Sequence, residues 1–222
     1  VERGQWVVCR RGRLLIGLRP LVYTRMLGTV TLTLETANHY QFLRARFPAD
    51  PWSPAEQFES PYHMGGPATH YALACMRHMH QYGTTHEQLA EIAVATRKWA
   101  MLNPKAMMRD PLTIDDVLSS RWITYPLHLL DCCLVTDAGG AVVVTSAERA
   151  RSLKKKPVWV LGSGEATTHQ TIANMPDLTT TPASISGPRA FAMAGVRHEE
   201  IDVVEVYDSF TYTALVTLEA LG

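Results

Sequence analysis

The chain has 222 residues, of which 46% are hydrophobic, and its 21 basic residues balance its 21 acidic residues. This size and composition can bury a real core in one large or two small domains, while the zero net charge gives no support to nucleic-acid binding. No apolar run approaches the roughly 20 residues that a membrane span needs, and the first residues do not resemble a signal peptide.

Residues 1–34 differ in composition from the rest of the chain. Residues 1–25 contain six arginines and a single acidic residue, and neither a helical nor a strand period is clear. We expect an irregular or strand-rich surface segment with exposed arginines. The alternative is an arm that binds anions.

A loop that is dense in proline and glycine is expected at residues 48–67, and three helices are expected after it. The helices cover residues 68–82, about 85–102 and about 113–120. Pro67 suits the first turn of a helix, and Gly83 suits the position just after one. The second and third helices begin at capping-box patterns, Thr85 with Gln88 and Thr113 with Asp116.

Three apolar runs that are rich in β-branched residues predict buried strands. They lie at residues 129–146, 158–165 and 201–206. Short helices are expected at residues 186–195 and 211–221, and the charged segment 147–157 predicts a helix end and a linker. This order predicts an α/β fold in which helices cover buried strands, with a domain boundary that divides the chain into residues 1–148 and 149–222.

The turn Tyr207-Asp208-Ser209 lies between the last predicted strand and the last predicted helix. Ligands of open α/β sheets gather at the carboxyl ends of strands, and a helix N-terminus presents free N–H groups with a partial positive charge. Asp208 or Ser209 is expected to cap the helix, and the pKa of Tyr207 is expected to fall from about 10. Tyr207 is therefore a candidate general acid or base. The alternative is that Tyr207 packs over the sheet edge and Asp208 is only a cap.

Two further residue types give weaker signals. His70, His78, His80 and His86 are not joined by a carboxylate or cysteine at ligand spacing, so we expect no metal site. The four cysteines show no disulfide-framework spacing, which predicts a reduced, cytoplasmic protein. Cys75 lies mid-helix among apolar residues, so we expect its side chain in the protein core.

Three long motifs resemble the thiolase superfamily. They are residues 71–104 (YALACMRHMHQYGTTHEQLAEIAVATRKWAMLNP), 110–144 (DPLTIDDVLSSRWITYPLHLLDCCLVTDAGGAVVV) and 187–213 (GPRAFAMAGVRHEEIDVVEVYDSFTYT). Within that superfamily the chain resembles the sterol-carrier or lipid-transfer-protein type, and most closely the bacterial aldolases that cleave steroid side chains. The resemblance covers about residues 36–222.

The resemblance implies a layered αβαβα fold and a homodimer. The helical insert at about 36–125 would be the loop domain over the acyl-CoA site, residues 1–148 would end the N-terminal half, and residues 149–222 would begin the C-terminal half. The chain is shorter than the family, lacks its nucleophilic-cysteine motif, and diverges from it over residues 1–34. We therefore expect an incomplete fold, a fragment of a longer gene with a frameshifted beginning.

The resemblance also implies roles for individual residues. Sterol-carrier thiolases carry His-Asp-Cys-Phe where this chain has Tyr207-Asp208-Ser209-Phe210, and tyrosine at the first position is similar to the aldolases. This implies retro-aldol cleavage of a sterol-derived β-hydroxyacyl-CoA, with Tyr207 in acid/base catalysis and with Asp208 and Ser209 orienting the turn.

Further implied sites surround the substrate. Cys133 and Leu134 would lie in the segment that touches CoA, and His63 and Met64 would lie over the substrate. The CoA thioester would be the substrate, with no resident cofactor. A small partner protein with an OB fold and a zinc ribbon is also implied.

Two other functions stay open. One is a Claisen-type acetyltransferase or 3-ketoacyl-CoA thiolase. The other is a non-catalytic fragment or a lipid- or CoA-binding module.

Overall fold

The computed structural model describes residues 51–62, 66–134, 142–169 and 171–222, together with the backbone of three strands at 6–10, 13–17 and 30–31. His63 and Met64, and the predicted strand residues 135–141, lie outside the described residues. The same holds for the arginine side chains of residues 1–34, so their exposure and the anion-binding alternative stay predictions.

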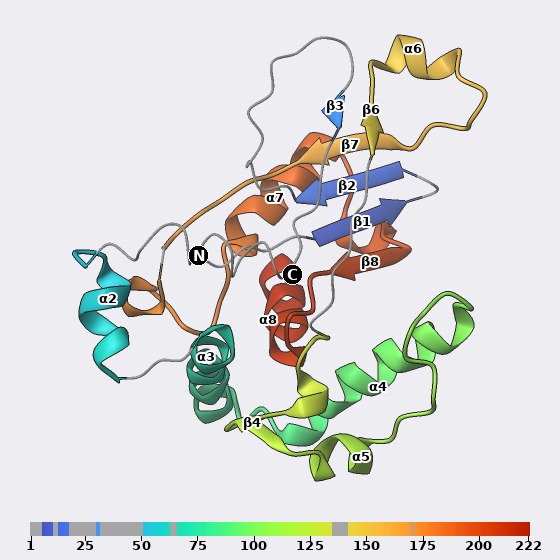
Figure 1. Ribbon diagram of the computed structural model, residues 1–222. Coiled ribbons are helices and arrows are strands. Elements are labelled where there is room, and N and C mark those ends of the chain that lie inside the picture. The colour runs from blue at the N-terminus through green and yellow to red at the C-terminus, as the bar shows by residue number, and fades with distance from the viewer. Residues whose placement is uncertain are drawn as a thin grey trace.

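A four-stranded mixed sheet forms one part of the molecule (Figure 1). Its spatial order is β7-β2-β1-β8, and its strands are β1 (Trp6–Arg10), β2 (Arg13–Gly17), β7 (Trp159–Ser163) and β8 (Val203–Val206). β1 is antiparallel to β2 and to β8, whereas β2 is parallel to β7. The strand-rich alternative for residues 1–34 is thus confirmed at β1 and β2.

Two helices pack against this sheet and against each other. α7 (Ala183–Ala194) contacts β7 and β2, and α8 (Thr211–Leu221) contacts α7 and β8. A small core joins them, in which Phe191 and Ala190 of α7 lie against Leu221 of α8. α7 begins three residues before its predicted start, and Gly195 ends it in the left-handed conformation (φ +63°), as predicted.

Glycines bring β7, α7 and α8 unusually close. A Cβ atom at Gly162 would lie 2.4 Å from the carbonyl oxygen of Ala190, and one at Gly164 would lie 2.0 Å from that of Ser186. Between α7 and α8, a Cβ atom at Gly187 would lie 2.7 Å from Leu221. The glycines of this segment therefore serve close packing.

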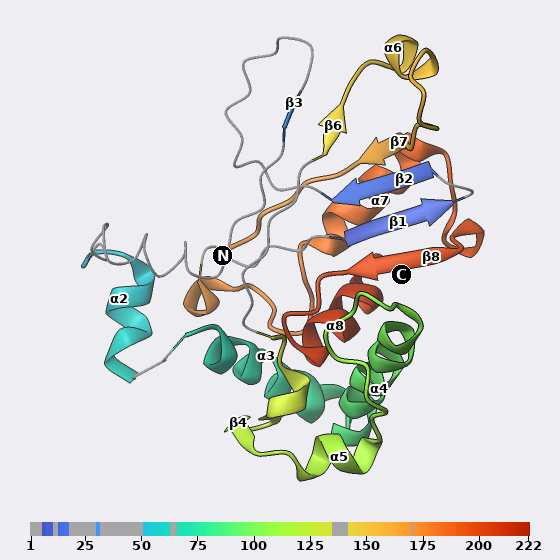
Figure 2. The ribbon, with the colours of Figure 1, turned by 45° about the vertical axis from the view of Figure 1, so that its right-hand side comes forward.

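The helical insert lies below the sheet in Figures 1 and 2, with α8 between the two. Its helices are α2 (Pro54–Phe58), α3 (Pro67–Tyr82), α4 (His86–Leu102) and α5 (Ile114–Ser119). The last three confirm the predicted helices, and both predicted capping boxes are present. The expected loop at 48–67 is wrong over α2, because the Ser53 hydroxyl caps this short helix at Glu56 N and Pro54 suits its first turn.

Short elements complete the described fold. They are two pairs of strands, β3 (Val30–Thr31) with β6 (Val143–Val144) and β4 (Trp122–Thr124) with β5 (Leu127–His128), the helix α6 (Ala147–Arg151), and the 3₁₀ turns η1 (Ser60–Tyr62), η2 (Leu129–Asp131), η3 (Ile172–Asn174) and η4 (His198–Glu200). The core of the insert packs Cys75 and Leu89 against Leu127, Phe210 and Tyr212. None of the described helices combines the length and apolarity of a membrane crossing.

The predicted burial of the strands is wrong. Residues 129–131 form the turn η2 in place of a strand, and Val143 is 71% exposed. Val160 of β7 and Val203 of β8 are also more than half exposed. Among the described strands β7 and β8 lie at the two edges of the sheet, so each pairs on one side only. The sequence of a strand does not reveal its place in the sheet.

Candidate functional site

The turn after β8 carries the candidate residues, but its side chains do not cap α8. The N-cap is Phe210, which makes no side-chain capping hydrogen bond, so the predicted cap by Asp208 or Ser209 is wrong. The Ser209 hydroxyl is instead 2.9 Å from Thr213 Oγ1, within the first turn of α8. Phe210 is buried and lies against the ring of Tyr71 in α3, with centroids 4.7 Å apart. The turn is therefore fixed by the packing of Phe210 and by the contact of Ser209 with Thr213, without a side-chain cap on α8.

Residues 131–133 run antiparallel to this turn and pair with it in register. Asp131 Oδ1 accepts a 2.7 Å hydrogen bond from Thr211 Oγ1. Cys132 forms an isolated β-bridge with Phe210, and the N–H of Cys133 donates to the carbonyl oxygen of Ser209 at 3.0 Å. Three consecutive residues of one segment thus hold three consecutive residues of the other.

Asp131 also shapes its own segment. Its Oδ2 accepts a 2.8 Å hydrogen bond from the backbone N–H of His128, which closes the turn η2. The carboxylate is 4% exposed and lies 3.4 Å from Nδ1 of His128, whose ring stacks on Trp122 with centroids 3.6 Å apart. A buried carboxylate needs such partners, and both of its oxygens have them.

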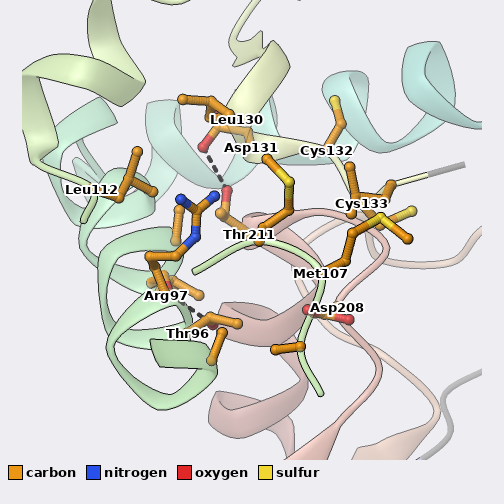
Figure 3. Close-up of a pocket in the computed structure, with 16 residues that line it drawn as sticks. Thr96, Arg97, Met107, Leu112, Leu130, Asp131, Cys132, Cys133, Asp208 and Thr211 are labelled. Carbon is orange, nitrogen blue, oxygen red and sulfur yellow. Dashed lines mark hydrogen bonds between the residues drawn. The ribbon is translucent and has the colours of Figure 1, made fainter. Parts of the chain in front are cut away.

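A cavity of about 420 Å³ lies where this pairing meets the helical insert (Figure 3). Its walls come from α4, from the segment 106–112, from residues 130–134, and from Asp208 and Thr211. Most of the lining side chains are apolar. Arg97 extends from α4 toward Thr211 (Figure 3) and donates to the carbonyl oxygen of Asp110 at 2.7 Å. The cavity thus combines an apolar wall with a few polar groups, as ligand sites do.

Tyr207 stands beside the cavity and is 47% exposed. Partial burial raises its pKa above the ordinary value, and the neighbouring Cys133 and Asp208 raise it further. The predicted fall in the pKa of Tyr207 is therefore wrong, because desolvation and negative neighbours act against the phenolate. At neutral pH this side chain is a phenol that can donate a hydrogen bond.

The described cysteines are also held in their neutral form. Burial, with a contribution from Asp131, raises the pKa of Cys75 to about 12 and that of Cys132 to about 11. Burial and then Asp208 raise the pKa of Cys133. Cys75 is fully buried, which confirms its predicted core position. None of the three described cysteines has the lowered pKa of an activated nucleophile.

The structure brings most of the predicted site residues together. Cys133, Leu134 and Asp208 line one cavity, and Tyr207 directly precedes Asp208 in the same turn. Ser209 is buried behind the turn. Cys133 and Leu134 are exposed to the cavity, although the apolar run 129–146 predicted buried strand residues here.

Three residues of the site were missed as candidates, namely Arg97, Asp131 and Thr211. Asp131 had a usable signal, since it is one of two acidic residues inside the apolar run 129–146 and directly precedes the segment expected to touch CoA. Arg97 and Thr211 had none, because an arginine or threonine in an amphipathic helix is ordinary. Within the described residues no cluster of three or more histidine, cysteine or acidic side chains could hold a metal ion.

Comparisons with known proteins give the family. Residues 164–222 match the family described as thiolase C-terminal domain-like. A steroid side-chain-cleaving aldolase of Thermomonospora curvata is 38% identical over 168 residues, which are 73% of this chain and 43% of the relative. The chain belongs to the thiolase superfamily.

Other thiolase-superfamily proteins support the same assignment. A 17-hydroxy-3-oxo-4-pregnene-20-carboxyl-CoA lyase of Mycobacterium tuberculosis is 37% identical over 180 residues, 78% of this chain and 47% of the relative. The solved structure of an Ltp2-ChsH2(DUF35) aldolase aligns with a TM-score of 0.73 and 32% identity, over 88% of this chain and 52% of the other. The thiolase-like fold class is thus confirmed, and this thiolase-superfamily chain spans less than half the length of these two curated relatives.

Proposed function

We propose that this chain belongs to an enzyme that cleaves a carbon–carbon bond of an acyl-CoA thioester by a retro-aldol reaction, with a sterol-derived β-hydroxyacyl group as the substrate class. The names of two similar relatives support this, since one is a steroid side-chain-cleaving aldolase and the other a steroid carboxyl-CoA lyase. The proposed substrate is the CoA thioester itself, with no resident cofactor.

The observation that carries the proposal is the protonated phenol of Tyr207 at the carboxyl end of β8. In a retro-aldol reaction the β-hydroxyl proton goes to a base, the Cα–Cβ bond breaks, and its electron pair forms the enolate of the CoA thioester. An enolate oxygen is stabilised by a fixed hydrogen-bond donor. The raised pKa of Tyr207 suits that donor role better than the role of a base.

Asp208 is the candidate base. Its carboxylate is exposed, lines the cavity, and acts electrostatically on both Tyr207 and Cys133. It would take the hydroxyl proton while Tyr207 holds the developing enolate. The products are a carbonyl compound, formed from the β-carbon, and the shortened acyl-CoA, which forms when the α-carbon of the enolate takes back the proton that Asp208 accepted. No acyl group passes to a thiol, so the neutral cysteines of the site fit this reaction.

Binding would use the cavity wall. Cys133 and Leu134 line the apolar cavity, whose volume of about 420 Å³ suits part of an extended acyl chain. His63 and Met64 are proposed to lie over the substrate. A homodimer in the cytoplasm and a partner with an OB fold and a zinc ribbon are part of the same proposal, and the aligned aldolase structure is named for two components, Ltp2 and ChsH2(DUF35).

Tyr207→Phe tests the proposal in the enzyme as its gene encodes it, with and without a co-expressed partner. The hydroxyl is lost and the ring is kept, so cleavage of a β-hydroxyacyl-CoA is expected to slow by about 10²–10³-fold. Tyr125→Phe is the matched control, because Tyr125 is a tyrosine of similar exposure (57% against 47% for Tyr207) that lies in the β4–β5 turn and not in the turn after β8. Equal rates for the two variants would overturn the role of Tyr207.

A thiolase reaction is the second candidate. An acetyl-CoA acetyltransferase of Methanothermobacter thermautotrophicus is 37% identical over 153 residues, 68% of this chain and 40% of the relative. Cleavage of a 3-ketoacyl-CoA that is insensitive to Tyr207→Phe and is blocked by iodoacetamide would favour this candidate. Binding of CoA without any turnover would favour a non-catalytic binding module.

A further inference from the structure

Asp131 and Thr211 form a buried contact that the proposed reaction does not use directly. Thr211 Oγ1 donates to Asp131 Oδ1 at 2.7 Å, and the two side chains are 6% and 4% exposed as residues. Both line the cavity, and Figure 3 shows their hydrogen bond at its wall. A carboxylate with so little access to water forms a strong hydrogen bond, and losing the donor leaves an acceptor unpaired.

The contact lies at the point where the catalytic turn enters α8. Thr211 is the first residue of α8, and the turn that carries Tyr207 and Asp208 ends one residue earlier at Phe210. No side chain caps α8, so the usual local device that fixes a helix start is absent from this described helix. The start of α8 is held locally by the contact between the Ser209 and Thr213 hydroxyls, and from outside by Asp131 and by the backbone pairing of Cys133 with Ser209.

Asp131 is itself held rigidly. Its second carboxylate oxygen accepts a hydrogen bond from the backbone N–H of His128 at 2.8 Å. His128 is 3% exposed, and its ring stacks on that of Trp122. The β4–β5 pair and η2 therefore fix the position of Asp131. Through its hydrogen bond with Thr211, Asp131 in turn fixes the position of the turn after β8. Side chains that lock reacting groups in this way matter because a displacement of about 1 Å can cost about 100-fold in rate.

We propose that Asp131 and Thr211 are positioning residues, whose hydrogen bond sets the register of the turn 207–210 against residues 131–133 and so fixes Asp208 in the cavity wall and Tyr207 directly before it. This inference rests on the proposed function of Tyr207. In this proposal Asp131 acts by holding the turn in place and does not need to touch the substrate.

The test compares Thr211→Val, which keeps shape and loses the hydroxyl, with Thr211→Ser, which keeps the hydroxyl. Thr217→Val is the matched control, since Thr217 is a buried threonine of the same helix that does not line the cavity. Thr211→Val is expected to lower kcat for the β-hydroxyacyl-CoA by about 10- to 100-fold with little change in KM. Thr211→Ser is expected to recover most of that loss, and Thr217→Val is expected to leave kcat near the starting value.

A double-mutant cycle with Tyr207→Phe separates positioning from general destabilisation. If Thr211 acts through Tyr207, adding Thr211→Val to Tyr207→Phe will cause little further loss of kcat. Full additivity, or an unchanged kcat in Thr211→Val, would overturn the positioning role while leaving the function of Tyr207 intact. An unchanged rate in Tyr207→Phe alone would overturn both proposals.

Folding is checked by thermal melting, with Thr211→Ala as a second variant. Loss of the folded state in both Thr211→Val and Thr211→Ala, with Thr217→Val folded, would make the contact structural only and would also overturn the proposal.

Discussion

Cys75, Cys132 and Cys133 form a series of decreasing burial around the candidate site. Cys75 is fully buried, Cys132 is partly buried and Cys133 is exposed. All three have a raised pKa, with burial as the first cause, so the reactive thiolate is scarce at neutral pH in each.

Alkylation by iodoacetamide is expected to follow that series. At pH 7.5 Cys133 should react slowly, Cys132 more slowly, and Cys75 only after unfolding. Because burial raises the pKa of Cys133, its alkylation rate should reach a plateau at a higher pH than the rate of the same cysteine in the unfolded chain. Peptide mapping by mass spectrometry, with the urea-unfolded chain as the control, measures each site. Fast labelling of Cys133 at pH 7 would contradict the raised pKa and would favour the thiolase candidate.

The candidate residues show what a sequence can predict at this scale. Tyr207 was identified because a strand, a polar turn and a helix follow one another within a few residues. Its pKa could not be predicted, because Cys133, which helps to raise it, lies more than 70 positions earlier in the chain. The bond between Asp131 and Thr211 spans 80 positions, so no local pattern could reveal it.

Among the elements, α3 and α8 are joined by a buried histidine. His78 is 2% exposed, and its ring nitrogens lie 2.8 Å from Thr84 Oγ1 and 2.8 Å from Glu219 Oε2. A neutral ring protonated at Nε2 satisfies both partners, because it donates to the carboxylate and accepts from the hydroxyl.

His78→Leu removes both hydrogen bonds and is expected to lower the free energy of unfolding by about 1–3 kcal/mol. His80→Leu is the control on the same helix, because His80 is exposed, and it should change that free energy by less than about 0.5 kcal/mol. Urea denaturation followed by circular dichroism measures both. Matching midpoints for the two variants would show that the His78 contacts add nothing.

The helices were predicted better than the strands, and the reason is physical. Helix bounds follow from local signals, such as the capping boxes at Thr85 and Thr113 and the left-handed Gly83 that ends α3. The burial of a strand depends on its neighbours in the sheet. β8 is an apolar run, yet it is an edge strand with exposed valines, and only the whole sheet decides that.

At the scale of the whole molecule, the sheet has two open edges within the described residues. β7 and β8 each pair on one side, and consecutive residues Val203 and Val204 are both exposed on β8. An exposed apolar edge is a template for pairing with another chain. The 222-residue chain alone should therefore self-associate at micromolar concentration.

Val204→Lys is expected to reduce that association, because a charge on an edge strand disfavours pairing. Leu102→Lys is the control, since it puts the same charge on a 76% exposed position of the helix α4, which offers no edge strand for pairing. Sedimentation velocity gives the size distribution of each. A monodisperse monomer with a sharp two-state melt for the unmodified chain would contradict the prediction.

Because Gly162, Gly164 and Gly187 have no side chains, the backbone and side-chain atoms that face them can approach closely. These glycines set the separation of β7 from α7 and of α7 from Leu221 at the end of α8. A methyl group at any of these glycines would push β7, α7 and α8 apart. The shift would move the C-terminal end of α8, which is the end opposite Thr211. Two features thus hold α8 in place beside the candidate site. One is the Asp131–Thr211 hydrogen bond at its N-terminal end, and the other is the close packing against glycine at its C-terminal end.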